Sequence, residues 1–359
     1  LLLISMTLAS VIRISPRYLA QAAMQGAWLA PLSSMLVMLL QLILLYGLLK
    51  DQSEDLSLYA VTRSTVGRGA ADALMVVGFL WALFVVGLYC RNFAIVLTTT
   101  LFPYIRPMVF ILLMLAVVAF ILYRGMVSLG RMNEIIFWVL TLTIVLVAVL
   151  LIPETEFRFL TPLANGVLGR SFTAGLLNGG NWVFLLIPLL PGGLIRQGKG
   201  FMKHGMKAVL ILGVLAVLAV NITVGTLSAD LVAHMPQPIF FAIKQVESIT
   251  SLQKNEALII TLSLMSDFVM VAVLILSMQG MLARLCRVKD AQHLNGLLLV
   301  AVLLFSLALA SGNYELEAVA QQLELPLNLI LGLGIPILLT LCLWVKKLFT
   351  RKKQAAAAS

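Results

Sequence analysis

Long apolar runs dominate this chain and restrict what it can fold into. A helix that crosses the roughly 30 Å hydrocarbon layer of a membrane needs about 20 mostly apolar residues. Segments rich in Leu, Val, Ile and Ala approach or exceed this length at 1–14, 28–49, 72–100, 107–123, 134–152, 171–194, 207–229, 256–283, 293–311 and 326–345. They lack the short alternating strands of a membrane β-barrel. The sequence therefore predicts an all-α polytopic membrane protein with about ten transmembrane helices.

Composition excludes most other classes. Hydrophobic residues make up 61% of the chain and charged residues 11%, whereas soluble domains are about half apolar and one quarter charged. The net charge of +10 is spread over short basic clusters between apolar runs, which does not indicate nucleic-acid binding. We expect no cofactor, metal site or enzyme activity, because the sequence has no nucleophile–base pair and no metal-ligand spacing. The cysteines and histidines are scattered: Cys90, Cys286, Cys342, His204, His234 and His293.

The distribution of basic residues predicts the orientation. If both termini are cytoplasmic, the inner loops hold most of the 25 Lys and Arg residues. The last outer loop, which contains Glu315, Glu317 and Glu324, has no Lys or Arg. Cytoplasmic loops of membrane proteins carry this excess of positive charge. We therefore expect an integral membrane protein with ten spans and both ends in the cytoplasm.

The connections are short, which predicts a single transmembrane domain over 1–353. The end, 354–359, has the composition of a tail or a linker scar. The first segment is too short to span a membrane, so we expect that its beginning is missing and that it is half of a broken helix. The longest outer connection, 228–255, contains an amphipathic stretch at 239–246 that predicts a short helix at the membrane interface.

Two segments carry signals of a helix broken within the membrane. Secondary transporters often consist of two inverted repeats, with binding sites where the first helix of each repeat is discontinuous. Ten spans divide into five plus five, so the first and sixth segments should be broken. The first is interrupted at 9–16 (ASVIRISP) and the sixth at 178–181 (NGGN), before Pro188 and Pro191. Unwound backbone there would bind an amino-acid carboxylate, an amine or an ion; alternatively, Gly and Pro only permit close helix packing.

The residues predicted to bind ligand follow from these breaks and from the polar residues in the outer half of the third segment. They are Ser10, Val11, Arg13, Tyr89, Asn178, Gly179, Gly180, Asn181 and Trp182.

Charges inside the apolar segments are a second signal, because each costs several kcal/mol unless it is paired. Asp267 lies near the middle of the eighth segment and Arg91 in the outer half of the third. Each would bind substrate, carry a proton or form a structural ion pair, and the two would only lock the bundle if they paired with each other. Arg13 would either recognise a carboxylate or extend to the outer surface.

Five stretches, in order along most of the chain, resemble the B-subunit family of bacterial spore germinant receptors, a branch of the amino-acid permeases. They are 15–29 (SPRYLAQAA…AWL), 89–93 (YCRNF), 101–107 (LFP…P), 124–135 (RG…GRMNEI) and 254–258 (KNEAL). The element at 124–135 is the most specific. The chain departs from the family pattern at Ala9-Ser10, where family members usually have a glycine, and at Arg13.

The resemblance implies a permease-like fold with two inverted five-helix repeats. It also implies a subunit that recognises a nutrient, usually an amino acid, in the spore inner membrane beside an A-type membrane subunit and a C-type lipoprotein. The departures leave open a ligand other than a simple neutral amino acid. Two other functions stay open: a proton-coupled amino-acid transporter that uses Asp267 or another buried carboxylate, and a structural receptor subunit that binds no ligand.

Overall fold

A computed structural model describes the chain except residues 51–55, 162–165, 196–199, 236, 248–254, 289, 311 and 359. The side chains of residues 9, 13, 157, 244–247, 255–263, 313 and 349–358 also lie outside the description. Within the described residues the secondary structure consists of helices, without strands. The prediction of an all-α membrane protein agrees with this.

The helices follow the apolar segments of the sequence. The α-helices are α1 (Leu2–Arg13), α2 (Ser15–Ala23), α3 (Ala30–Leu49), α4 (Leu58–Thr65), α5 (Arg68–Thr100), α6 (Pro107–Leu151), α7 (Val167–Asn178), α8 (Leu186–Leu189), α9 (Phe201–Leu227), α10 (Ala229–His234), α11 (Pro238–Glu247), α12 (Asn255–Cys286), α13 (Asn295–Ala308), α14 (Asn313–Val319) and α15 (Leu325–Ala358). The 3-10 helices are η1 (Met24–Leu29), η2 (Ile152–Glu154), η3 (Phe157–Phe159), η4 (Gly179–Trp182) and η5 (Ala291–Leu294), and η6 (Ala320–Glu324) is a π-helix.

Seven helical stretches among the described residues are long and apolar enough to cross a membrane. They are Ser15–Leu49, Arg68–Thr100, Pro107–Glu154, Phe201–Leu227, Leu264–Cys286, Ala291–Ala308 and Tyr314–Leu348. Two of the predicted segments, 107–123 and 134–152, fall within the third stretch. At about 1.5 Å per residue, the 45 residues of α6 would extend roughly 68 Å if straight, which is more than twice the hydrocarbon thickness. The count of ten spans and the inverted repeats stay predictions.

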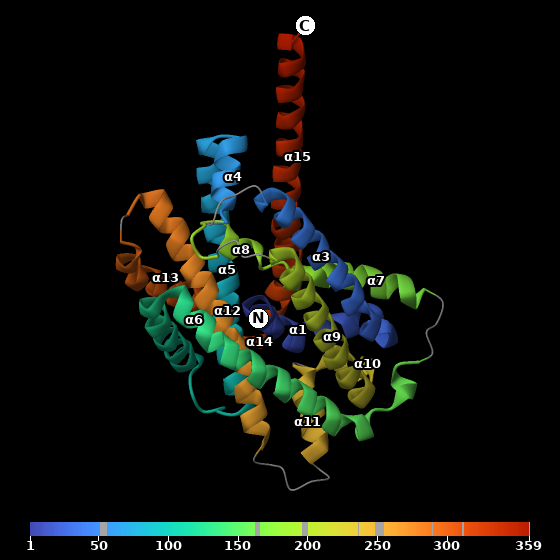
Figure 1. The fold of residues 1–359 in the computed structure, drawn as a ribbon. Coiled ribbons are helices and arrows are strands. Elements are labelled where there is room, and N and C mark those ends of the chain that lie inside the picture. The colour runs from blue at the N-terminus through green and yellow to red at the C-terminus, as the bar shows by residue number, and fades with distance from the viewer. Residues whose placement is uncertain are drawn as a thin grey trace.

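Gly125 divides α6 into two helices. Its backbone has φ 76° and ψ 178°, which a residue with a side chain rarely adopts. In Figure 1 the two parts of α6 run in clearly different directions. The glycine of the RG…GRMNEI element is therefore the turn between the fourth and fifth predicted segments.

The centre of the bundle is formed by α5 and α12, which pack along each other. Every residue from Val269 to Met278 is buried, and so is every residue from Val85 to Leu97. A helix that is buried all round lies in the core of a bundle. By contrast, α6 exposes large apolar side chains such as Phe120, Trp138 and Leu142, which suits a lipid-facing position.

The two ends of the bundle differ. In Figure 1 the C-terminal part of α15 projects beyond the other helices at the end where α4 lies, and α10 and α11 lie at the opposite end. The short helix predicted at 239–246 is confirmed as α11. It buries Ile239, Phe240 and Ile243, so its apolar side packs on the protein.

The first segment is interrupted within the predicted range 9–16, but only at Ile14, which separates α1 from α2. α1 remains helical through Ser10 and Val11, and Ile14, which separates it from α2, keeps right-handed angles (φ −89°, ψ −44°). The carbonyl of Ser10 accepts hydrogen bonds from the Ile14 amide (3.0 Å) and the Ser15 hydroxyl (3.3 Å), so it is not a free acceptor. The marked departure from helical geometry comes later, at Met24 (φ 52°), where η1 begins.

Candidate functional site

The sixth predicted segment is discontinuous where the sequence predicts it. α7 ends at Asn178, η4 continues to Trp182, and helical structure resumes at Leu186 in the short helix α8. Val183 (φ −91°, ψ 17°) leaves the helical region directly after η4. All of η4 is buried, so this irregular backbone lies inside the protein, where a membrane protein tolerates it.

The two glycines of η4 permit close approach to other helices. A Cβ atom on Gly179 would lie 2.7 Å from the side chain of Val37, and one on Gly180 would lie 2.4 Å from the carbonyl oxygen of Leu325. The glycines therefore do permit close helix packing, because residues of α3 and α15 lie against the backbone of the break.

Polar side chains also hold the break to α3. The Asn178 amide donates to the Ser34 hydroxyl (3.0 Å), and the Asn181 amide donates to the Asn178 side-chain oxygen (3.2 Å). Ser34 donates to the carbonyl of Gly175 (2.7 Å). At the C-terminal end of the break, the side-chain amide of Gln41 donates to the carbonyl of Val183 at 2.7 Å. Asn178 is thus used within the fold.

Some buried polar atoms at the break have no hydrogen-bond partner among the described residues. They are the side-chain oxygen of Asn181 and the indole nitrogen of Trp182, both on η4. Asn181 and Trp182 are fully buried. Most buried polar groups in proteins are hydrogen-bonded, so a group of exceptions at one place needs an explanation such as a ligand or water.

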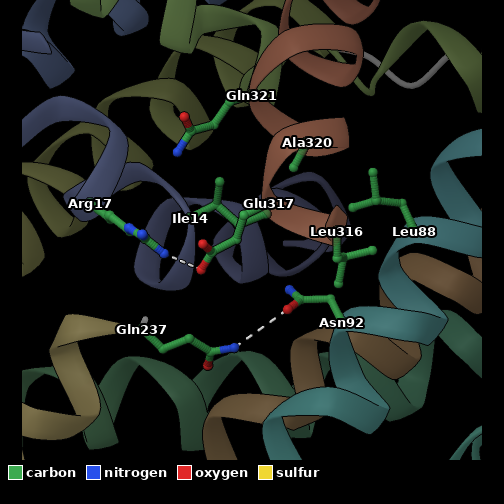
Figure 2. A pocket seen from close by; sticks show the side chains of 9 residues that line it. All are labelled: Ile14, Arg17, Leu88, Asn92, Gln237, Leu316, Glu317, Ala320 and Gln321. Atoms are coloured by element: carbon green, nitrogen blue, oxygen red, sulfur yellow. Dashed lines mark hydrogen bonds and ion pairs between the residues drawn. The ribbon is translucent and has the colours of Figure 1, made fainter. Parts of the chain in front are cut away.

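A polar cleft, whose empty volume of about 490 Å³ includes open solvent, lies where α2, α5, α14 and η6 meet. Figure 2 shows its lining side chains, which come from α2, α5, α14 and η6 and from the turns next to α1 and α11. These residues define the polar cleft: Ile14, Arg17, Leu88, Asn92, Gln237, Leu316, Glu317, Ala320 and Gln321.

An ion pair and several amide contacts border the polar cleft. Arg17 pairs with Glu317 (Figure 2), and their side chains are 15% and 23% exposed. The Arg17 guanidinium also donates to the carbonyl of Ala233 (3.3 Å). Gln237 donates to the side-chain oxygen of Asn92 at 3.4 Å. The cleft therefore offers one cation, one anion and several amides to a small polar solute.

The polar cleft is lined by immediate neighbours of predicted site residues rather than by those residues. Ile14 follows Arg13, Leu88 precedes Tyr89, and Asn92 follows Arg91. Tyr89 is fully buried and instead packs edge-on against Phe184, directly behind the break, with ring centroids 6.2 Å apart. The side chain of Arg13 lies outside the described residues. The ligand-binding assignment of the predicted residues stays a prediction.

The two charges predicted inside the bundle are buried. Asp267 on α12 is fully buried and interacts electrostatically with Cys90 on α5. Arg91, 8% exposed, interacts electrostatically with Glu315. Arg91 therefore has an acidic neighbour other than Asp267, and the alternative that Arg91 and Asp267 pair stays a prediction.

A second cleft of about 480 Å³ is almost entirely apolar. It lies between α1, α6, α9 and α11 and is lined by residues such as Ile12, Ile144 and Phe240. It lacks charged groups to orient a polar nutrient, so the polar cleft is the better candidate for solute entry. In the part of the chain that the structure describes, no three His, Cys, Asp or Glu residues are grouped to hold a metal ion.

Arg17, Glu317 and Glu324 are not among the functional residues that the sequence predicts. In the sequence Arg17 is one residue of the SPRYLAQAA stretch, and the two glutamates lie in a loop without basic residues. The available signal was the acidic cluster directly before an apolar segment. The partner of Glu317, which is Arg17 on α2, is 300 residues away in the sequence, so only the folded structure shows that the two residues pair.

Comparison with known proteins places these features in context. The family model described as spore germination protein matches residues 1–313 of the chain, which includes both sides of the η4 break and α1 to α13. No curated protein matches the chain.

Proposed function

This chain belongs to the spore permease family of spore germination proteins, and we propose that it is the nutrient-sensing membrane subunit of a spore germination receptor. Its nutrient is an amino acid, bound beside η4. Its place is the spore inner membrane, together with an A-type membrane subunit and a C-type lipoprotein. Membership of this family and the apolar helices indicate a germination-related integral membrane protein.

The unpaired polar atoms at the break carry this proposal. The Asn181 side-chain oxygen is a hydrogen-bond acceptor and the Trp182 indole is a donor, and both are buried without a partner among the described residues. A zwitterionic amino acid presents an ammonium donor and a carboxylate acceptor, which complement these two groups. A site that pairs buried donors and acceptors with its ligand discriminates strongly against molecules that lack them.

The polar cleft supplies a route for such a ligand. Arg17 suits a carboxylate and Glu317 suits an ammonium group. A zwitterion would therefore replace the Arg17–Glu317 ion pair with two equivalent contacts, one to each residue. Ala320 and Gln321 extend the lining onto η6. The residue that follows η6, Leu325, contacts Gly180 of the break through its carbonyl. The short helix η6 therefore connects the polar cleft to the proposed site.

Sensing requires that the ligand binds one conformation better than another, because a ligand shifts an equilibrium only by its differential affinity. An amino acid between α1 and η4 would stabilise the arrangement in which these elements are in contact. The helices that pack on the break, α3 and α15, would transmit this change in conformation to partner subunits.

A proton-coupled amino-acid transporter is the alternative, and the buried carboxylate of Asp267 favours it. Intramembrane carboxylates in transporters often carry protons. The two functions share a binding site and differ in whether solute crosses the bilayer.

Reconstitution in lipid vesicles separates these functions. Radiolabelled amino acids are added to vesicles with and without an inward proton gradient, and both bound and internal label are measured. The sensing proposal expects saturable binding with no accumulation in either condition, lost in Asn181→Leu. Accumulation driven by the gradient would establish transport instead, and the absence of any binding would contradict both.

A further inference from the structure

Glu324 is a buried carboxylate that neither function above uses. It is the last residue of the π-helix η6 and is fully buried. One oxygen, Oε1, accepts a hydrogen bond from the Asn328 amide at 3.4 Å. The other oxygen, Oε2, has no partner among the described residues. An ionised carboxylate in such a place would be poorly compensated, since 3.4 Å is long for a hydrogen bond to a charged group.

The orientation of Asn328 is fixed by a second buried contact. The indole of Trp81 on α5 donates to the Asn328 side-chain oxygen at 2.7 Å, and both residues are buried. Asn328 therefore presents its amide group, rather than its oxygen, toward Glu324. The three residues form a chain from α5 to η6 that ends on the carboxylate.

No cation is available to neutralise Glu324 among the described contacts. On α14 and α5, which pack near η6, the charged groups interact with other residues: Glu317 with Arg17, Glu315 with Arg91, and Asp72 with Arg68. Neither α3 nor η4 has a charged residue, and the described basic residues of α15, Lys346 and Lys347, lie more than 20 positions beyond Glu324. The Glu324 side chain must therefore be protonated or bind another cation.

The position of Glu324 connects the polar cleft to the break. Ala320 and Gln321, at the start of η6, line the cleft, and Leu325 directly after Glu324 contacts Gly180 through its backbone. The Asn328 oxygen already accepts from Trp81, and among the described residues no three His, Cys, Asp or Glu side chains are grouped to hold a metal ion. A metal cation needs several oxygen ligands, so a proton is the cation that this site suits. π-helices within α-helical segments are frequent at functional sites.

We propose that Glu324 is a proton-binding site. The carboxyl group is neutral while η6 and α15 are packed against η4. When this contact opens and water enters from the polar cleft, the O–H bond breaks, the proton passes to a water molecule, and the carboxylate that remains is hydrated. Proton release is thereby linked to separation of α15 from the break. The proposal does not depend on nutrient binding, so it stands or fails separately from the sensing function.

Infrared spectroscopy of the full chain in lipid tests the protonation state directly. Spectra at about pH 6, where glutamic acid in water is mostly ionised because its pKa is about 4.3, are compared for three proteins. The wild type and Glu317→Gln should both show the carbonyl band of a neutral carboxylic acid. Glu324→Gln should lose that band, and the band should decline in the wild type as the pH is raised.

A chemical probe covers the case in which Glu324→Gln does not fold. N,N′-dicyclohexylcarbodiimide adds to protonated carboxyl groups in apolar surroundings, and the carboxyl proton moves to a carbodiimide nitrogen. Peptide mapping of the wild type labelled at about pH 6, well above the usual glutamate pKa, should place the adduct on Glu324. An unlabelled Glu324, or a neutral-acid band that persists in Glu324→Gln and disappears in Asp267→Asn, would overturn the proposal.

Discussion

Arg17 of α2 forms an ion pair with Glu317 of α14 at the edge of the polar cleft, and this pair joins the two ends of the sequence. A second contact links α2 to η6, because Gln321 donates to the side-chain oxygen of Gln21 at 3.0 Å. Gln21 in turn donates to the carbonyl of Ala233 at 2.8 Å, which attaches α10. Polar contacts at the edge of the cleft therefore connect α2 with α14, η6 and α10.

We expect Glu317→Gln to lower the free energy of unfolding by about 1 kcal/mol, because it leaves the partly buried Arg17 without its anion. The effect should be non-additive with Arg17→Gln in a double-mutant cycle followed by thermal unfolding. Arg106→Gln, at an exposed position, is the control and should have little effect. Additive single effects would mean that the pair does not contribute as a unit.

Gly180→Ala should destabilise the protein by about 1–3 kcal/mol, because the new Cβ would meet the Leu325 carbonyl oxygen, which is backbone and has little room to move. Gly334→Ala on α15 is the matched control: nothing lies within 4 Å of its Cβ position, and alanine favours a helix. Melting temperatures of the two variants in the same lipid give the comparison. Equal stability would argue against close packing of α15 on η4.

Asn178→Ala should cost about 1–3 kcal/mol, because the buried Ser34 hydroxyl and the Asn181 amide lose a partner. Combining it with Ser34→Ala in thermal unfolding should show strong coupling. Thr173→Ala, on the exposed face of the same helix, should be nearly neutral. A nutrient response that survives in Asn178→Ala would support a structural role for this residue.

Trp81→Phe should also destabilise the protein, by about 1–3 kcal/mol, since it leaves the buried Asn328 oxygen without a donor. Trp138→Phe is the control, because Trp138 is 64% exposed on α6. Thermal unfolding measures both. A neutral Trp81→Phe would indicate that Asn328 finds another donor, and the orientation of its amide toward Glu324 would then lose its basis.

The sequence predicts much of the helical framework because each apolar run is a local signal. The break at η4 is also local: two glycines between two asparagines weaken the helix whatever surrounds it. The interruption predicted at 9–16 is milder, because α1 and α2 are separated only by Ile14, which keeps right-handed angles. Without a glycine there, the backbone stays helical, and Ser15 with Ile14 satisfies the Ser10 carbonyl.

The polar cleft could not be predicted, because it depends on residues that only the fold brings together. Arg17 and Glu317 are 300 positions apart, and neither has a motif that indicates the other. The sequence predicts that Glu324 lies in a loop before the last apolar segment, whereas in the structure helical geometry extends through η6 and Glu324 is buried. Periodicity does not reveal a π-helix, since its insertion depends on the packing of its neighbours.

The most direct test of the account is a thermal-shift screen of the purified protein against the twenty amino acids, repeated with Asn181→Leu. A ligand at about 100 times its Kd should stabilise the wild type by about 2.7 kcal/mol. The account predicts that at least one amino acid raises the melting temperature of the wild type and that this shift disappears in Asn181→Leu. A well-folded wild type that no amino acid stabilises, or a shift of equal size in the variant, would contradict an amino-acid site at η4.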